Sequence, residues 1–194
     1  MTARGVVMRG ALLVSLALVG CAGLVSLADV GVDAQRDVTH AGWVRVRSMR
    51  YGVSLMLPGT PRVLEEVDDT RLRREGVVLV LSLDAEARRS YEVRLFRAAR
   101  TDDAATMLDA WGEELFARSR GQLAGEEHVE IGGQPGLDVR YEQVGPRHDD
   151  QLWVLVATDG RSIVEVAAQN PRVAEEDPRP AELQTIAESI TFGR

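Results

Sequence analysis

Residues 151–167 read QLWVLVATDGRSIVEVA, two apolar runs on either side of the dipeptide Asp159-Gly160. An Asp-Gly pair between two such runs is a strong local indication of a β-hairpin, because the tight turn needs positive backbone φ angles that these residues tolerate. Runs rich in Val, Ile, Leu and Trp also suit the pleated surface of a sheet. This stretch therefore predicts two antiparallel strands joined by a short turn.

More strands are expected on both sides of this hairpin. Several runs alternate apolar and polar side chains, which is typical of strands with one buried face. One run, residues 77–83, is continuously apolar and is expected in the interior of a sheet. The expected strands cover residues 43–49, 53–57, 63–67, 77–83, 91–96, 126–131, 137–142, 151–157 and 162–167.

Two amphipathic helices complete the pattern. Thr101 is expected as the N-cap of the first helix. The order of strands, helix, strand meander and helix predicts an α+β fold, in which two helices pack against an antiparallel sheet. The apolar stripes that would face the sheet are Ala104, Leu108, Trp111 and Leu115 in the first helix, and Leu183, Ile186, Ala187 and Ile190 in the second.

Three stretches give the chain a resemblance to a known fold family. They are YGVSLMLPGTP at residues 51–61, IGGQPG at residues 131–136 and IAESITF at residues 186–192. In the order of its elements and turns, the chain resembles the PsbP-like family over residues 43–192. The resemblance implies a PsbP-like sandwich and a role in binding or assembly, since the family has no shared active site. It supplies no functional residues to transfer, because a fold alone does not carry function.

The N-terminus has the layout of an exported bacterial lipoprotein. Arg4 and Arg9 precede an apolar segment, and no acidic residue occurs before Asp29, which is the arrangement of a secretory signal. The run Leu18-Val19-Gly20-Cys21 resembles a lipobox, with an aliphatic residue three positions before the cysteine and a small residue directly before it. By that resemblance the chain is cut before Cys21, which carries a thioether-linked diacylglycerol and an amide-linked acyl chain such as palmitate. Two or more acyl chains attach a protein stably to a membrane.

Two alternatives to lipidation remain open. Residues 10–28 contain no charge, and this run is long enough to cross a bilayer as an uncleaved anchor, for which about 20 apolar residues are needed. Ser26-Leu27-Ala28 could also serve as an ordinary signal cleavage site. All three interpretations export the protein.

These observations divide the chain into three parts. Residues 1–20 are the expected signal peptide, residues 21–42 a lipidated N-terminus and flexible tether, and residues 43–194 a single PsbP-like α+β domain. The domain is long enough for one hydrophobic core. Cys21 is the only cysteine of the sequence, so no disulfide is expected in the folded domain.

The sequence contains no catalytic or metal-binding motif. His40, His128 and His148 lack further ligands at metal-binding spacing, and neither a Gly-x-Ser-x-Gly elbow nor a phosphate-binding loop occurs. We therefore expect no catalytic residues, metal or cofactor. The chain carries 23 basic and 30 acidic residues. An acidic protein repels the phosphate backbone, so no nucleic-acid partner is expected.

An enzyme would require carboxylates that converge only in the folded structure. Glu165 and Glu142 are the candidates, although strand alternation puts both on the solvent face together with Arg140. Two buried carboxylates within hydrogen-bonding reach in a deep pocket would support this alternative, an envelope hydrolase.

The sequence thus predicts a lipid-anchored binding or assembly module of the cell envelope without catalytic activity. We expect it to be held through Cys21 on the periplasmic side of a bacterial membrane, with an envelope protein or a small ligand as its partner. The alternatives are the hydrolase and a scaffold subunit of a larger membrane-associated complex.

Overall fold

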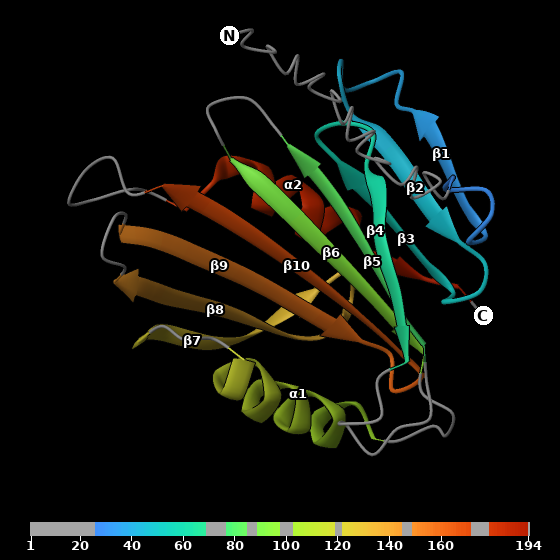
Figure 1. Ribbon diagram of the computed structural model, residues 1–194. Helices are drawn as coiled ribbons and strands as arrows, with labels where there is room; N and C mark the ends of the chain where they lie inside the picture. Colours follow the sequence, from blue (N-terminus) through green and yellow to red (C-terminus); the bar gives the residue numbers. More distant parts are fainter. Residues whose placement is uncertain are drawn as a thin grey trace, which may run out of the picture.

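The computed structural model describes residues 26–68, 77–84, 89–97, 103–118, 122–144, 149–171 and 179–193. Within these ranges the chain forms two antiparallel sheets and two helices (Figure 1). The small sheet consists of β1 (Val32–Arg36), β2 (Val44–Ser48), β3 (Val53–Leu57) and β11 (Thr191–Phe192), in that spatial order. The large sheet consists of β4 (Arg62–Asp68), β5 (Val77–Asp84), β6 (Ser90–Arg97), β10 (Ser162–Pro171), β9 (Asp149–Thr158), β8 (Gln134–Val144) and β7 (Gln122–Ile131), in that spatial order.

The predicted hairpin joins β9 to β10 in the large sheet, with Ile163 opposite Thr158. Gly160 adopts a φ of 80°, the left-handed conformation that the turn requires. The carboxylate of Asp159 accepts hydrogen bonds from the backbone N–H groups of Arg161 and Ser162, at 2.9 and 2.8 Å. The turn residues therefore act as the sequence predicted, and the strands β7 to β10 form the predicted meander.

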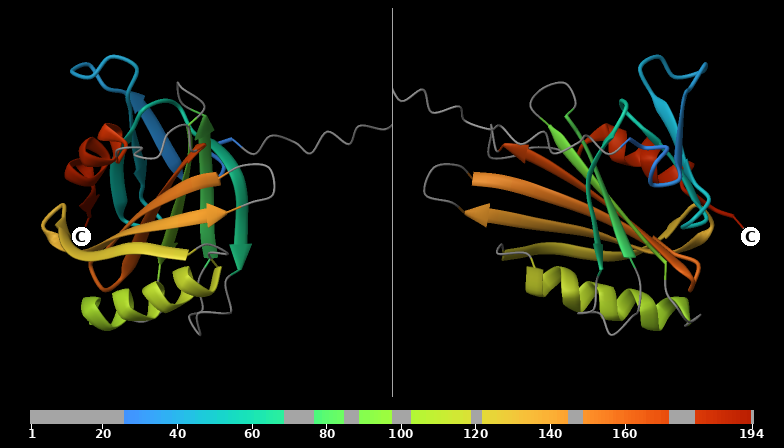
Figure 2. Two further views of the ribbon diagram at one scale, coloured as in Figure 1. Left: turned by 90° about the vertical axis from the view of Figure 1, so that its left-hand side faces the viewer. Right: turned by 45° about the vertical axis from the view of Figure 1, so that its right-hand side comes forward.

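The large sheet has a hydrophobic core on each of its two faces. The helix α1 (Ala104–Arg118) covers one face with Met107, Leu108 and Trp111, which are all buried. The small sheet and the helix α2 (Ala181–Ser189) lie on the opposite side, as Figure 2 shows. Both helices thus pack against antiparallel sheets, which confirms the predicted α+β class. The described part of the chain contains no helix that is long and apolar enough to span a membrane.

A hydrogen-bonded contact joins α2 to the small sheet. The hydroxyl of Ser189 accepts a hydrogen bond from the backbone N–H of Met56 at 2.8 Å, and donates one to the carbonyl of Ile186 at 2.7 Å. The chain then continues directly into β11, which pairs with β3. The C-terminal segment therefore closes the small sheet over the core.

The helix α1 begins two residues later than the proposed cap would allow. Thr101 lies outside the described residues. The carboxylate of Asp103 instead accepts a hydrogen bond from the backbone N–H of Thr106 at 3.1 Å. This is the N-cap arrangement, in which a side-chain oxygen satisfies an otherwise unpaired N–H of the first turn.

The segment predicted as a flexible tether contains a strand. Val32–Arg36 forms β1, which pairs along its whole length with β2, and Val30 and Val32 are buried in the core. For these residues the prediction of a slack linker was wrong. An alternation is present, since Val32 and Ala34 face the core and Asp33 and Gln35 are exposed, but it is short and weakly apolar and so resembles a linker.

This difference leads to a test of where the domain begins. A chain that starts at Gly42 lacks β1, so its free energy of unfolding is expected to be about 3 kcal/mol or more below that of a chain that starts at Ser26, because two valines lose their burial. Urea unfolding of both chains measures the difference. Equal free energies of unfolding would show that β1 adds nothing to the domain.

Candidate functional site

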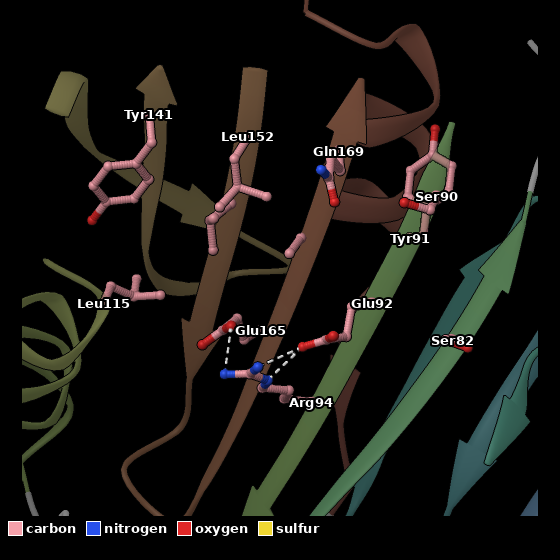
Figure 3. Close-up of a pocket in the computed structure, with 12 residues that line it drawn as sticks. Ser82, Ser90, Tyr91, Glu92, Arg94, Leu115, Tyr141, Leu152, Glu165 and Gln169 are labelled. Atoms are coloured by element: carbon pink, nitrogen blue, oxygen red, sulfur yellow. Dashed lines mark hydrogen bonds and ion pairs between the residues drawn. The ribbon is translucent and has the colours of Figure 1, made fainter. Parts of the chain in front are cut away.

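A cavity of about 280 Å³ opens on the face of the large sheet that carries α1. Its floor is formed by β5, β6, β10, β9 and β8, beyond the part of the face that α1 covers (Figure 3). The register places Arg94 of β6 directly opposite Glu165 of β10, and Glu92 opposite Ala167. Three charged side chains therefore lie together at the middle of the sheet.

Arg94 connects the two carboxylates of this cluster. Its guanidinium donates to the Glu92 carboxylate through Nε at 2.7 Å and contacts the same oxygen through Nη2 at 2.6 Å. Its Nη1 lies 3.7 Å from Oε1 of Glu165. The side chains of Glu92 and Arg94 are 35% and 28% exposed, whereas that of Glu165 is 4% exposed. The cluster therefore has a buried acid beneath and an accessible ion pair above.

The buried position of Glu165 is fixed from the α1 side. The indole Nε1–H of Trp111 donates a hydrogen bond to Oε2 of Glu165 at 2.6 Å. Burial raises the pKa of Glu165, and the nearby positive charge of Arg94 and the hydrogen bond from Trp111 only partly oppose this rise. A buried carboxylate that is also hydrogen-bonded and paired avoids most of the penalty for removing charge from water.

Apolar side chains surround the polar cluster. Leu115 reaches in from α1, Leu152 and Val154 come from β9, and Tyr141 comes from β8 (Figure 3). Polar side chains, among them Ser82, Ser90 and Gln169, also line the cavity, so its wall is mixed, with apolar side chains and fixed polar groups together as in small-molecule sites. The cavity volume of about 280 Å³ is just below the usual range of ligand-site volumes, so the ligand must be small.

The arrangement is suited to binding rather than to proton transfer. Glu165 and Glu92 are both held by the same guanidinium, and only Glu165 is buried. Burial raises the pKa of Tyr91, another residue of the cavity wall, to about 12, so its phenol stays protonated at neutral pH. The two buried carboxylates that an envelope hydrolase would need are therefore not found in this cavity.

The structure separates the two carboxylates that the sequence suggested. Glu165 was predicted on a solvent face, but it is buried, because α1 covers its face of β10 and the small sheet covers the other. Glu142 lies on β8 next to Tyr141, and strand alternation puts it on the face opposite to the cavity. The prediction that both share a solvent face with Arg140 was wrong for Glu165.

Five further predicted residues lie away from the cavity or outside the described part of the chain. The lipobox residues Leu18, Val19, Gly20 and Cys21 lie outside the described residues. His128 is exposed on β7, and in the described ranges no group of three His, Cys, Asp or Glu side chains is placed to hold a metal ion.

Sequence reasoning missed Glu92 and Arg94. A signal was present, because Glu92 and Arg94 are two residues apart in a predicted strand and so share one face. Glu165 is likewise the only charged residue in the apolar run 162–168. What the sequence lacks is the register that puts β6 beside β10, since these strands are far apart in the chain.

Comparisons with known proteins return similarity of fold only. No family model and no curated protein matches the sequence. Among solved structures, the chain is similar to LpqN of Mycobacterium tuberculosis, which is involved in cell envelope biogenesis, at 14% identity and a TM-score of 0.47, over 87% of this chain and 98% of that one. It is also similar to cyanobacterial PsbP (CyanoP) from Synechocystis sp. PCC 6803, at 18% identity and a TM-score of 0.48, over 82% and 98% of the two chains. At these values neither similarity assigns this chain to a family or gives it a ligand.

The raised pKa of Glu165 predicts a pH dependence of stability. Above the ordinary glutamate pKa of 4.5, the folded protein binds more protons at this site than the unfolded chain does. The free energy of unfolding contributed by this group is therefore complete below pH 4.5 and falls as the pH rises toward the folded-state pKa. Glu165→Gln keeps the side-chain shape and an acceptor for Trp111 but removes this titration, so the variant is expected to lack this decrease.

Urea unfolding of wild type and Glu165→Gln across mildly acidic to neutral pH measures the difference. As the pH rises, the free energy of unfolding of wild type should fall relative to that of Glu165→Gln. Parallel pH profiles would contradict the proposed burial of the carboxyl.

Proposed function

We propose that this chain is a lipid-anchored binding module of the bacterial cell envelope, without catalytic activity, whose cavity beside α1 takes up a small amphipathic molecule. The observation that carries the binding role is the cavity itself, with an accessible ion pair over a buried carboxylate and both apolar and polar side chains around them. The envelope location and the anchor rest on the N-terminal sequence, above all on Cys21.

The start of the folded domain supports lipidation over ordinary cleavage. Leu27 packs against the hydrophobic core, and its carbonyl accepts a hydrogen bond from the backbone N–H of Val32 at 2.8 Å. Cleavage after Ala28 would remove this contact from the mature protein, together with the three hydrogen bonds between Ser26 and Asp29. Cleavage before Cys21 keeps all of them.

The same segment argues against an uncleaved anchor. Residues 26–28 form a hydrogen-bonded turn on the domain, so the uncharged run available to the membrane shortens from residues 10–28 to residues 10–25. A spanning helix needs about 20 apolar residues, and the range begins at about 17. The shortened run is below that range.

The charge balance of the cavity indicates the chemistry of the ligand. Arg94 is already compensated by Glu92, so an anionic ligand would compete with Glu92 and a cationic one with Arg94. A neutral head group that both donates and accepts hydrogen bonds, such as an amide, can add to the pair without separating it. The apolar walls then favour an alkyl or aromatic body.

The anchor is tested by Cys21→Ser. This variant is expected to remain uncut and unlipidated, because the lipoprotein peptidase acts on the diacylated cysteine. Mass spectrometry of the membrane fraction should find the lipidated Cys21 N-terminus in wild type and the full precursor in the variant. An unmodified mature protein that begins at Asp29 would overturn the anchor.

The cavity is tested by filling it. Ala167→Leu adds a side chain to the cavity floor, between Glu165 and Gln169, and is expected to abolish the binding of hexanamide, a neutral amphipathic probe. Ala105→Leu, the same change at an exposed position of α1, is the matched control and should bind as wild type does. NMR chemical shifts of the strands β6, β9 and β10 provide the measurement.

The charged probe hexanoate should cause smaller shifts than hexanamide. Binding of hexanamide that survives in Ala167→Leu would show that this cavity is not the ligand site. Stronger binding of hexanoate would show that the ligand class is wrong.

A further inference from the structure

A second cavity, of about 510 Å³, lies at the end of the molecule where β2 passes into β3. The β9–β10 turn and the C-terminal residues after β11 also line it. Arg47, Arg97 and Arg161 come to this cavity from β2, β6 and the β9–β10 turn, and all three are exposed. Three separate parts of the chain thus bring a cation to one cavity of an otherwise acidic protein.

In the described part of the chain the three guanidinium groups form no ion pair with a carboxylate, and Arg97 donates a hydrogen bond to the backbone carbonyl of Arg50 at 2.8 Å. Among the residues that the structure describes, none places a carboxylate within 4 Å of the guanidinium groups of Arg47, Arg97 or Arg161. Asp159, which also lines the cavity, is engaged by two backbone N–H groups of its own turn. Asp33, opposite Arg47 in the sheet, accepts a hydrogen bond from Gln35 at 2.8 Å.

A buried hydroxyl adds an unused hydrogen-bonding group to the wall. Ser48 lines the cavity and is 1% exposed, and its hydroxyl has no hydrogen-bond partner in the described part of the chain. Buried polar groups are nearly always paired, so an unpaired one needs an explanation. Because strand alternation puts Ser48 on the face of β2 opposite to Arg47, this hydroxyl needs a partner other than an anion held at Arg47.

The path of the chain places this cavity beside the anchored end. Val32, the first residue of β1, is opposite Ser48 in the register, and its backbone N–H bonds to the carbonyl of Leu27. Cys21 is six residues before Leu27, so covalent geometry keeps it within about 22 Å of that residue. The chain that follows Cys21 therefore enters the small sheet at the end that carries the cavity, which allows an anchor at Cys21 to bring this end to the membrane.

An apolar side chain stands at the same end. Met49, between β2 and β3, also lines the cavity and is 77% exposed. An exposed apolar residue beside basic ones is typical of surfaces that contact the interface of an anionic membrane. An exposed apolar side chain adds nothing to the binding of a free anion, so Met49 favours a lipid as the source of the phosphate.

We infer that this cavity binds phosphate groups, and that in the anchored protein these belong to the head groups of anionic lipids. The guanidinium groups provide bidentate donors for phosphate oxygens, which is the geometry that favours arginine at phosphate sites. The lipid source of the phosphate rests on the anchor proposed at Cys21, whereas the affinity for phosphate does not. Binding would orient the domain with the β2–β3 turn on the membrane.

The first arm of the test uses inorganic phosphate. The full-length lipidated protein, held in micelles of a neutral detergent, is titrated with phosphate by calorimetry. Arg47→Gln and Arg161→Gln are each expected to weaken binding about fivefold or more, the usual effect of losing one such cation. Arg45→Gln, which removes the same charge from an exposed position of the same strand but does not line the cavity, is the matched control and should bind as wild type does.

The second arm uses vesicles, in which the same proteins are reconstituted. Hydrogen exchange of residues 47–54 and 159–162 should be slower in vesicles that contain phosphatidylglycerol than in pure phosphatidylcholine. The Arg47→Gln/Arg161→Gln double variant should lose this protection. Met49→Gln should lose part of it while still binding inorganic phosphate, because its role is at the lipid interface.

The outcomes separate the possible explanations. Phosphate binding without vesicle-dependent protection would overturn the lipid source and leave a site for a soluble phosphate. Equal effects of Arg45→Gln and the cavity variants would show diffuse charge attraction and overturn the site. If Cys21 proves not to be lipidated but the calorimetry shows the expected losses, the anchor fails and the phosphate site stands.

Discussion

The burial of β10 on both of its faces is the constraint on which the rest of this structure depends. One face of β10 lies under α1, and the other faces the small sheet and α2. A strand in this position must be apolar on both sides, and residues 163–168 are, except at Glu165. The hydrogen bond from Trp111 and the charge of Arg94 are what make a carboxylate tolerable there.

Glu165, the charged residue in this apolar strand, lies at the candidate site. The helix α1 covers only part of its face of the sheet, and the cavity begins where the helix ends, around Leu115. The ion pair of Glu92 and Arg94 lies at the opening, above the buried Glu165. Arg94, which helps to stabilise the buried acid, thus also lines the cavity and can offer hydrogen bonds to a ligand. A change in Arg94 would therefore affect both the stability of the sheet and the properties of the cavity.

The N-terminal strand β1 connects the folded domain closely to the proposed anchor. Because β1 is part of the small sheet, the anchor proposed at Cys21 is joined to a folded edge rather than to a long linker. The short remaining segment limits how far the domain can move from the membrane. The arginine-lined cavity faces that end, whereas the cavity beside α1 lies on a different face of the large sheet. The two proposed sites can therefore act independently.

The sequence alone determined the local structure. Asp159-Gly160 set the hairpin, and the stripe of Leu108, Trp111 and Leu115 set the buried side of α1, because turns and amphipathic helices are encoded by neighbouring residues. Only the tertiary structure decided which residues of distant strands face each other in the sheets. The pairing of Arg94 with Glu165 depends on a register between distant strands, and the placement of β1 depends on an edge that supplies a partner to a strand with little pattern of its own. Such long-range contacts leave no periodic trace in the sequence, and for that reason the cluster at the cavity and the true start of the domain could not be derived from it.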